Sequence, residues 1–171
     1  MSKRIILISI VVAVVFLIAA LYLNTHSKRG VTAAPGKGVE TTKKLEWFDY
    51  DTGLLKASKD KKPIVIIFHA DWCHFCKKMD NKTLSDKSVR DYLNKNFIVI
   101  KIDTQKDKKT ASSYQVMGLP TTWFLESDAT RIGPLSGYIP PDQFIGILRY
   151  IGGKHYKNMS LKDFLKKGRG M

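Results

Sequence analysis

The longest apolar stretch of the chain lies close to its N-terminus. Ile5 to Leu23 is nineteen residues without a charged side chain, and as an α-helix it would extend about 28 Å, the hydrocarbon thickness of a bilayer. A cleavable signal peptide would have an apolar core of about 7–15 residues with small residues directly behind it. Here the small residues Thr32 to Ala34 follow only after Lys28 and Arg29. The pattern therefore favours an uncleaved transmembrane anchor.

Charges on the two sides of this stretch bear on its orientation. Lys3 and Arg4 precede it, while Lys28, Arg29 and three further lysines follow it, so nearby positive charge does not favour an N-terminus inside the cytoplasm. The leader is only residues 1–4, however, and long domains are translocated largely regardless of charge. We expect the C-terminal part of the chain to lie outside the cytoplasmic membrane, on its periplasmic side.

Behind the expected anchor, residues 5–23, the pattern changes three times. Residues 24–42 are rich in Gly, Ala, Thr and Lys without an apolar period, which is typical of a flexible linker. Residues 43–153 alternate between short apolar runs and segments with helical spacing, so they predict one globular domain. Residues 154–171 are mainly basic and predict a C-terminal tail.

Within residues 43–153 the apolar pattern predicts strands that alternate with helices. Ile64–Phe68 is a continuous apolar run behind Pro63, which is typical of a strand buried on both faces. Further strands are expected at 45–48, 97–102, 122–125 and 131–138, with a turn near Ser127 and Asp128. Helices are expected at 51–59, from 73 to 79 or 82, after a cap at Ser85 or Asp86, at 110–115, and from Pro140 or Pro141 to Gly152 and Gly153. The order β-α-β-α-α-β-α-β-β-α predicts an α/β fold with a partly parallel sheet covered on both faces.

Both cysteines of the chain lie in one short motif, Cys73-His74-Phe75-Cys76. A structural zinc site would usually need a second pair of Cys or His ligands, and none follows at a suitable spacing. A structural disulfide is also disfavoured, because it would close a loop of four residues and restrict the unfolded chain little. The motif follows a buried strand and opens a helix, which favours a redox-active dithiol.

The expected position of Cys73 at the start of a helix has a chemical consequence. Unpaired backbone N–H groups and the helix dipole favour negative charge there, and cysteines in such settings have pKa values of about 3.5–7.5 instead of about 8.5. Cys76 comes one turn later on the same face, so the two can form a disulfide, and we expect Cys76 to be the less exposed of the pair. Cys73 would attack a partner disulfide, and Cys76 would resolve the mixed disulfide.

The segment Phe68–Lys77 reads Phe-His-Ala-Asp-Trp-Cys-His-Phe-Cys-Lys and resembles the active site of thioredoxin-like proteins. It is more similar still to the C-terminal domain of the transmembrane reductase DsbD and its single-domain relatives. Met117–Thr121, Met-Gly-Leu-Pro-Thr, resembles the second signature of that family. The resemblance covers about Leu45 to Ile151. It implies a thioredoxin-like fold with a central mixed sheet and a protein-disulfide oxidoreductase without a cofactor, with the reductase direction favoured.

The resemblance also implies roles for individual residues. Cys73 matches the attacking cysteine and Cys76 the resolving one. Pro120 matches a cis-proline that faces the dithiol, and Leu119 before it would offer backbone groups to an extended partner strand. Trp72 matches the aromatic residue beside the nucleophile. The alternatives are a trans loop proline at position 120 and a tryptophan that is merely packed.

Some positions depart from the family pattern. Many thioredoxins carry a buried acid six residues before the attacking cysteine, where this chain has Ile67. A proton acceptor for the resolving cysteine is therefore not obvious, and Asp71 and Glu126 are weak substitutes. His74 and Phe75 replace the common Gly-Pro pair between the cysteines, and we expect them to modulate redox potential or partner choice.

His69, at the end of the expected strand, is interpreted as a packed histidine in preference to a catalytic one. His69 and the Cys73–Cys76 motif do not make up a set of metal ligands, so no metal and no cofactor are expected.

The net charge of +14 raises the question of an anionic partner. Lys and Arg are spread through most segments and are not gathered with aromatic residues on one stripe, so no nucleic acid is expected. The densest run is the tail, for which anionic lipid headgroups beside the anchor are one counter-charge and a merely solvated basic face is the alternative.

The expected partners are therefore protein disulfides or dithiols, a membrane protein that donates electrons, and in addition an anionic membrane surface. Two other classes remain open from the residues alone. One is a thioredoxin-fold binding module for partner docking or metal delivery. The other is a basic protein that binds nucleic acid or lipid and carries an incidental dithiol.

Overall fold

The computed structural model describes residues 17–18 and 44–168. The chain falls into two units, residues 1–40 and 41–171, and the account below concerns the second. The expected leader (1–4), most of the expected anchor (5–23) and the expected linker (24–42) lie outside the described residues. Within the described ranges, no helix combines the length and apolar character that a bilayer crossing requires.

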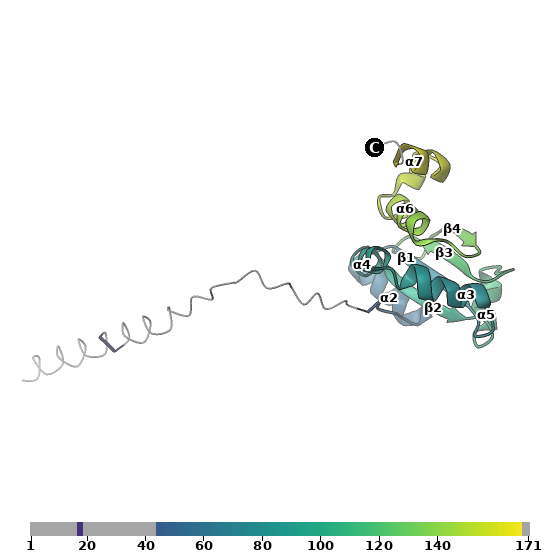
Figure 1. Ribbon diagram of the computed structural model, residues 1–171. Coiled ribbons are helices and arrows are strands. Elements are labelled where there is room, and N and C mark those ends of the chain that lie inside the picture. Colours follow the sequence, from purple (N-terminus) through teal and green to yellow (C-terminus); the bar gives the residue numbers. More distant parts are fainter. Residues whose placement is uncertain (1–16, 19–43, 169–171) are drawn as a thin grey trace, which may run out of the picture. The chain divides into compact units, whose positions relative to one another are not determined.

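Four strands form one mixed sheet at the centre of the domain (Figure 1). The strands are β1 (Ile64–His69), β2 (Ile98–Asp103), β3 (Thr121–Leu125) and β4 (Arg131–Ser136). Their order across the sheet is β2-β1-β3-β4, with β1 parallel to β2, and β3 antiparallel to both β1 and β4. This is the central mixed sheet expected from the sequence.

Strand β1 is apolar from Ile64 to Phe68 because both of its faces are covered. Val65 and Ile67 point into a core formed with α4 (Lys87–Asn96) and α6 (Pro141–Gly152). Ile64, Ile66 and Phe68 point into a second core, formed with α2 (Tyr50–Asp60) and α5 (Lys108–Ser113). The alternation of side chains along a strand thus divides one apolar run between two layers of helices.

Aspartate caps define where several helices begin. Asp49 accepts a hydrogen bond from the Thr52 N–H at 2.9 Å and starts α2, and Asp86 accepts from the Val89 N–H at 3.0 Å and starts α4. Such side-chain oxygens satisfy backbone donors that the first helical turn leaves unpaired. Helix α3 (His74–Lys78) continues into a π-helical turn, η1 (Met79–Leu84), where a simple continuation of the helix to 79 or 82 was expected.

The first strand predicted from the sequence, at 45–48, is not present. Phe48 alone makes a parallel bridge, to Ile100. The neighbouring backbone groups are engaged elsewhere, because the Glu46 N–H donates to the side-chain oxygen of Asn94 and the Lys44 carbonyl accepts from the amide of the same Asn94. The backbone then turns at Asp49 into α2, so a longer strand cannot form.

The sequence pattern predicted α6 as the last element, but two further elements follow it. A 3₁₀ turn, η2 (His155–Lys157), and a helix, α7 (Leu161–Gly168), follow it in the segment expected to be a basic tail. Phe164 of α7 stacks on His155 with ring centroids 4.6 Å apart and lies 5.5 Å from the Tyr150 ring of α6. These contacts, together with partly buried Leu161, add the segment to the core of the domain.

Candidate active site

Cys73 lies where β1 ends and α3 begins. It is the N-cap residue of α3, and its Sγ accepts a hydrogen bond from the Cys76 N–H at 3.1 Å. Its own N–H donates to the Ala70 carbonyl at 3.0 Å, which closes the turn between strand and helix. An N–H group directed at this sulfur stabilises negative charge on it. The expected position of Cys73 at a helix N-terminus is confirmed.

The structure is the oxidised form, with a disulfide between Cys73 and Cys76 and 5.2 Å between their Cα atoms. Both cysteines are 4% exposed, so the expectation that Cys76 would be the less exposed is wrong for this form. The reason is that the bonded pair packs as one unit against Ala70 and Leu119. A partner must therefore reach the sulfurs through the surface that surrounds them.

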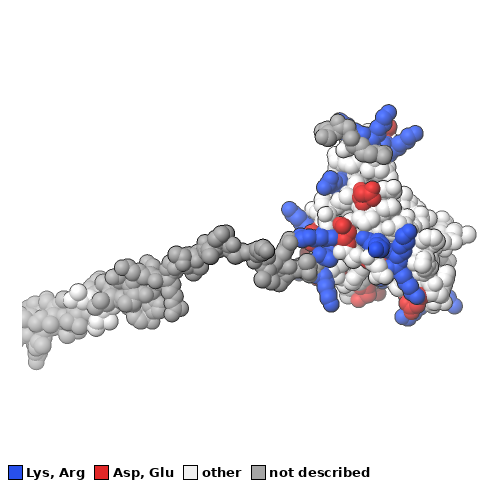
Figure 2. Space-filling model, in the orientation of Figure 1, with Lys and Arg blue, Asp and Glu red and all other residues white. Residues whose placement is uncertain are grey.

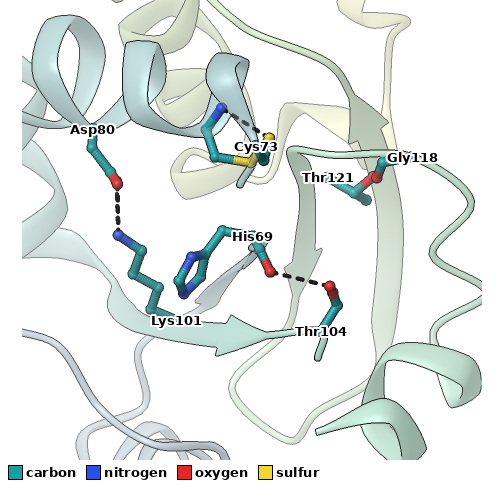
Figure 3. Close-up of a disulfide and its surroundings, with 8 residues drawn as sticks. His69, Cys73, Asp80, Lys101, Thr104, Gly118 and Thr121 are labelled. Atoms are coloured by element: carbon teal, nitrogen blue, oxygen red, sulfur yellow. Dashed lines mark hydrogen bonds and ion pairs between the residues drawn. A yellow bond between two sulfur atoms is a disulfide. The ribbon is translucent and has the colours of Figure 1, made fainter. Parts of the chain in front are cut away.

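The loop that faces the disulfide carries a cis peptide bond between Leu119 and Pro120, as the family resemblance implied. Leu119 packs against the cysteine cluster. The loop is held at both ends, since the Thr121 hydroxyl donates to the Gly118 carbonyl at 2.7 Å and the Gly137 N–H donates to the Pro120 carbonyl at 2.7 Å. Figure 3 shows Gly118 and Thr121 beside the disulfide.

Large apolar side chains are exposed around the disulfide. Trp72 is 67% exposed, Phe75 54% and Met117 97%. Trp72 is thus not a packed core residue, which removes that alternative. His74 is also exposed, and its ring contacts Phe75 edge to face at 5.7 Å. Exposed apolar groups that gather at one place are typical of a surface that contacts another protein.

A groove of about 660 Å³ opens next to Trp72 and extends toward α5. Its lining residues include Trp72, Thr104, Lys108, Gln115, Met117 and Leu119. Sequence reasoning did not identify Lys108 or Gln115, because nothing in the pattern relates α5 to the cysteine motif. Only the fold brings α5 and the loop that follows it beside Trp72.

A cluster of polar side chains from β1, β2 and η1 lies near the disulfide (Figure 3). Lys101 pairs with Asp80 of η1 at 2.8 Å, and the ring of half-buried His69 lies near Lys101. Burial, and after it the charge of Lys101, lowers the pKa of His69 and favours its neutral form. The His69 carbonyl accepts from the Thr104 N–H at 2.9 Å. His69 therefore has the surroundings of a packed histidine.

Of the two acids considered as proton acceptors, Asp71 is exposed and lies two positions before Cys73, and Glu126 is engaged by residues of the C-terminal extension, 154–168. Ile67, which stands where many thioredoxins have a buried acid, is 2% exposed and is surrounded by apolar side chains. Glu126 accepts a hydrogen bond from the Tyr156 hydroxyl, which lowers the pKa of the carboxyl, and it pairs with Lys154 and Lys157. Glu126 thus connects the C-terminal extension to the end of β3.

No metal site accompanies the dithiol in the part of the chain that the structure covers. Over residues 17–18 and 44–168, no group of three or more His, Cys, Asp or Glu side chains is placed to hold a metal ion.

Comparison with known proteins relates this geometry to a family. The family described as thioredoxin-like domain matches residues 50–152. The thiol:disulfide interchange protein DsbD of Neisseria meningitidis is 33% identical over 105 residues, which are 56% of this chain and 18% of that protein. DsbD of Campylobacter jejuni is 31% identical over 88 residues, 49% of this chain and 15% of that protein. The chain thus spans less than a fifth of the length of these relatives.

Solved structures are similar over the same region. A thioredoxin from Thermus thermophilus has a TM-score of 0.59 at 29% identity, over 64% of this chain and 88% of that chain. The oxidised C-terminal domain of Neisseria meningitidis DsbD has a TM-score of 0.50 at 27% identity, over 62% of this chain and 99% of that chain. Residues 154–168 lie outside the family match.

Proposed function

Because this chain belongs to the thioredoxin-like domain family, we propose that it is a thiol-disulfide oxidoreductase that acts on disulfides of other proteins. The observation that carries the proposal is the placement of Cys73. Its sulfur caps α3, accepts the Cys76 N–H and is bonded to the Cys76 sulfur, beside the loop of Leu119 and Pro120. A thiol at such a place ionises readily, and a second thiol within bonding distance can complete the exchange.

The exchange has two steps, both of which conserve atoms and electrons. In the reduced protein, the Cys73 thiolate attacks one sulfur of a partner disulfide, a mixed disulfide forms, and the other partner sulfur leaves as a thiolate. Cys76 then gives up its proton and attacks the Cys73 sulfur, so that the second partner sulfur leaves and is protonated. The partner gains two electrons, and this protein ends in the oxidised form that the structure presents.

We favour the reductase direction, in which a dithiol of a membrane protein returns two electrons to the Cys73–Cys76 disulfide. Similarity to proteins called thiol:disulfide interchange protein DsbD supports dithiol–disulfide exchange as the reaction, and the resemblance of the Cys73 motif to a transmembrane reductase is our reason for this direction. The apolar run 5–23 supports attachment of the domain to the membrane, and its length matches a bilayer. We place the domain on the periplasmic side, where protein disulfides form and persist.

The partner surface in this proposal is the exposed rim of Trp72, Phe75 and Met117 with the adjoining groove. Apolar contacts there would orient a partner disulfide toward the buried sulfurs, which is how binding energy promotes a reaction between two chains. Backbone groups of Leu119 lie beside the disulfide, at the place where an extended partner segment would pass.

Trapping of the mixed disulfide tests the proposal. The full chain with Cys76→Ser, reduced and mixed with insulin, should form a covalent adduct that dithiothreitol cleaves, because the resolving thiol is missing. The double variant Cys73→Ser, Cys76→Ser is the matched control and should form none. Failure of the single variant to form an adduct, in a sample that retains its fold by circular dichroism, would contradict a catalytic dithiol.

Measurement of the reduction potential tests the direction. Equilibration of the full chain with glutathione or dithiothreitol buffers should give a value near about −270 mV, that of a reductant. A value near about −120 mV would instead identify an oxidant, and the assignment of direction would then be wrong.

A further inference from the structure

The segment 154–168 extends the domain beyond residue 152, where the family match ends. It is held to α6 in a defined position. The Tyr150 hydroxyl donates to the Met159 carbonyl at 2.7 Å, and a Cβ added to Gly146 would lie only 2.7 Å from the Leu165 side chain. Groups on the outer side of this segment are therefore presented by an ordered surface.

The outer side of the segment carries cations. The exposed cations of α6, η2 and α7 are Arg149, Lys154, Lys157, Lys162, Lys166 and Lys167, which we call the basic platform. Figure 2 shows Lys and Arg side chains projecting around this end of the domain. The single acid of residues 153–168, Asp163, accepts a hydrogen bond from the Ser160 hydroxyl at 2.6 Å.

Part of the basic platform lacks an internal counter-charge. Lys154 and Lys157 pair with Glu126. Over residues 44–168, by contrast, no carboxylate forms an ion pair with Lys162, Lys166 or Lys167. Like charges four residues apart on a helix, as at positions 162 and 166, repel each other. An anionic partner would relieve that repulsion.

A cleft between α6 and α7 adds a second feature to the basic platform. It has a volume of about 480 Å³ and is lined by apolar Ile145, Met159 and Phe164, by the cations Arg149 and Lys167, and by one acid, Asp142. Apolar groups beside cations match the junction of a phospholipid, where an anionic phosphate meets the first apolar groups. A free phosphate ion would use only the cations.

We propose that the basic platform binds the anionic phospholipid surface of a bilayer. The expected anchor and the expected linker, 24–42, would tether the domain to the membrane. Such a tether raises the effective concentration of the surface, so that weak contacts are sufficient. The cations of the platform supply most of the attraction to the surface, so binding decreases at high salt.

This binding would leave the dithiol accessible. Helix α7 contacts α6 and η2, whereas α3 contacts η1. Figure 1 places α7 and α3 at different ends of the domain. A bilayer on the basic platform would thus orient the domain with its partner rim away from the contact, and the inference is independent of the redox proposal.

Lysine footprinting of the full chain tests the proposal. The protein is reconstituted with vesicles of pure phosphatidylcholine, or with vesicles in which a third of the lipid is phosphatidylglycerol, and acetylated briefly before mass spectrometry. Acetylation of Lys162, Lys166 and Lys167 should be about three- to fivefold slower in the anionic vesicles. Exposed Lys59 of α2 and Lys109 of α5 are internal controls and should react equally in both.

Two triple variants separate position from total charge. Lys154 and Lys157 belong to the same platform and should also react more slowly in anionic vesicles. The variant Lys162→Gln, Lys166→Gln, Lys167→Gln should abolish that protection of Lys154 and Lys157. Lys59→Gln, Lys95→Gln, Lys109→Gln removes the same charge from other faces and should leave that protection intact. High salt should remove the protection of the unmodified chain.

Three results would overturn the proposal. The first is equal acetylation of the platform lysines in both kinds of vesicle. The second is equal protection of Lys59 and Lys109, which would indicate adhesion without a defined surface. The third is the same protection in neutral vesicles on addition of inorganic phosphate, which would identify a phosphate site in place of a bilayer contact.

Discussion

The rim around the dithiol and the C-terminal extension differ in which side chains they expose to solvent. At the rim, Trp72 and Met117 expose large apolar groups, while the two cysteines beside them are buried. In the extension, Phe164 packs inward and the lysines of α7 project outward. One surface thus offers apolar contact around a reactive bond, and the other offers charge on a packed helix.

This difference indicates two kinds of contact. Apolar contact requires close fit and loss of water, so it selects a partner at short range and positions its disulfide. Charge acts over about a Debye length and requires little fit, so it suits a surface that is extended and variable. The first region lies inside the family match and the second outside it. The family fold therefore carries the chemistry, and the extension adds a separate surface.

The largest expected effect divides the two regions by chemistry. Cys73→Ser removes the nucleophile, so reduction of insulin in the presence of dithiothreitol should fall at least about 1,000-fold, to the uncatalysed level. Protection of Lys162 and Lys166 in anionic vesicles should not change, because α7 packs on α6 and η2 whereas α3 packs on η1. Retained turnover would contradict the role of Cys73, and lost protection would contradict the independence of the two regions.

The next effect detaches the extension. Gly146→Ile places a branched side chain against Leu165, where even a Cβ would lie 2.7 Å away, and should destabilise the packing of α7 by about 1–2 kcal/mol after the gain in helix propensity. Amide hydrogen exchange over residues 161–168 should become faster, while insulin reduction stays unchanged. Gly152→Ala, at the end of the same helix, is the control, and unchanged exchange in Gly146→Ile would disprove the contact.

These two sites also differ in how far the sequence predicted them. The dithiol is readable because its determinants are local: a run of five apolar residues, an N-terminal helix position for Cys73, and a cysteine one turn later. The cis bond at Pro120 was predicted correctly only through the family resemblance. Local determinants did not show that Cys76 and Cys73 are equally buried, since that depends on Leu119, which is distant in sequence.

The extension carries a local helix signal that the basic composition of the segment obscured. Leu161, Phe164 and Leu165 have the i, i+3, i+4 spacing of one helical face, and Ser160 and Asp163 exchange hydrogen bonds at the helix start. The spacing does not show what α7 packs against. The extension is held by partners in α6 and by Tyr156, whose hydroxyl donates to Glu126 thirty residues earlier. The predicted strand at 45–48 failed for a similar reason, because Asn94 of α4 engages the backbone that would have paired.

A smaller effect concerns partner recognition at the rim. Trp72→Ala removes an apolar group that is 67% exposed, and should lower kcat/KM for insulin about tenfold, as loss of a contact residue does. Reduction of a small disulfide such as oxidised glutathione should change less than about twofold, because such a substrate does not span the rim. Trp47→Ala, which replaces a partly exposed tryptophan under Lys101, is the matched control. Equal losses for both substrates would show that Trp72 acts on the dithiol and not on the partner.

The smallest effect tests the bond that joins the extension to the sheet. Folding lowers the pKa of Glu126 below its ordinary 4.5, chiefly because the Tyr156 hydroxyl donates to it, with Lys157 and Lys154 contributing. The folded state thus favours the carboxylate, so the stabilisation is present above about pH 4.5 and is lost as the pH falls through the lower folded pKa. Glu126→Gln should lower the free energy of unfolding by about 1 kcal/mol at pH 7 and by less at pH 3.

Urea denaturation at the two pH values measures this difference, and Tyr156→Phe provides the second arm of a double-mutant cycle. The two substitutions should be less than additive at pH 7, because each removes the same hydrogen bond, and closer to additive at pH 3, where less of the carboxylate form is present than at pH 7. Additive effects at both values would mean that Glu126 and Tyr156 stabilise the protein separately. The extension would then be held to the domain by its packing on α6 alone. The hydrogen bond between Tyr156 and Glu126 would not contribute to joining the charged extension to the domain that carries the dithiol.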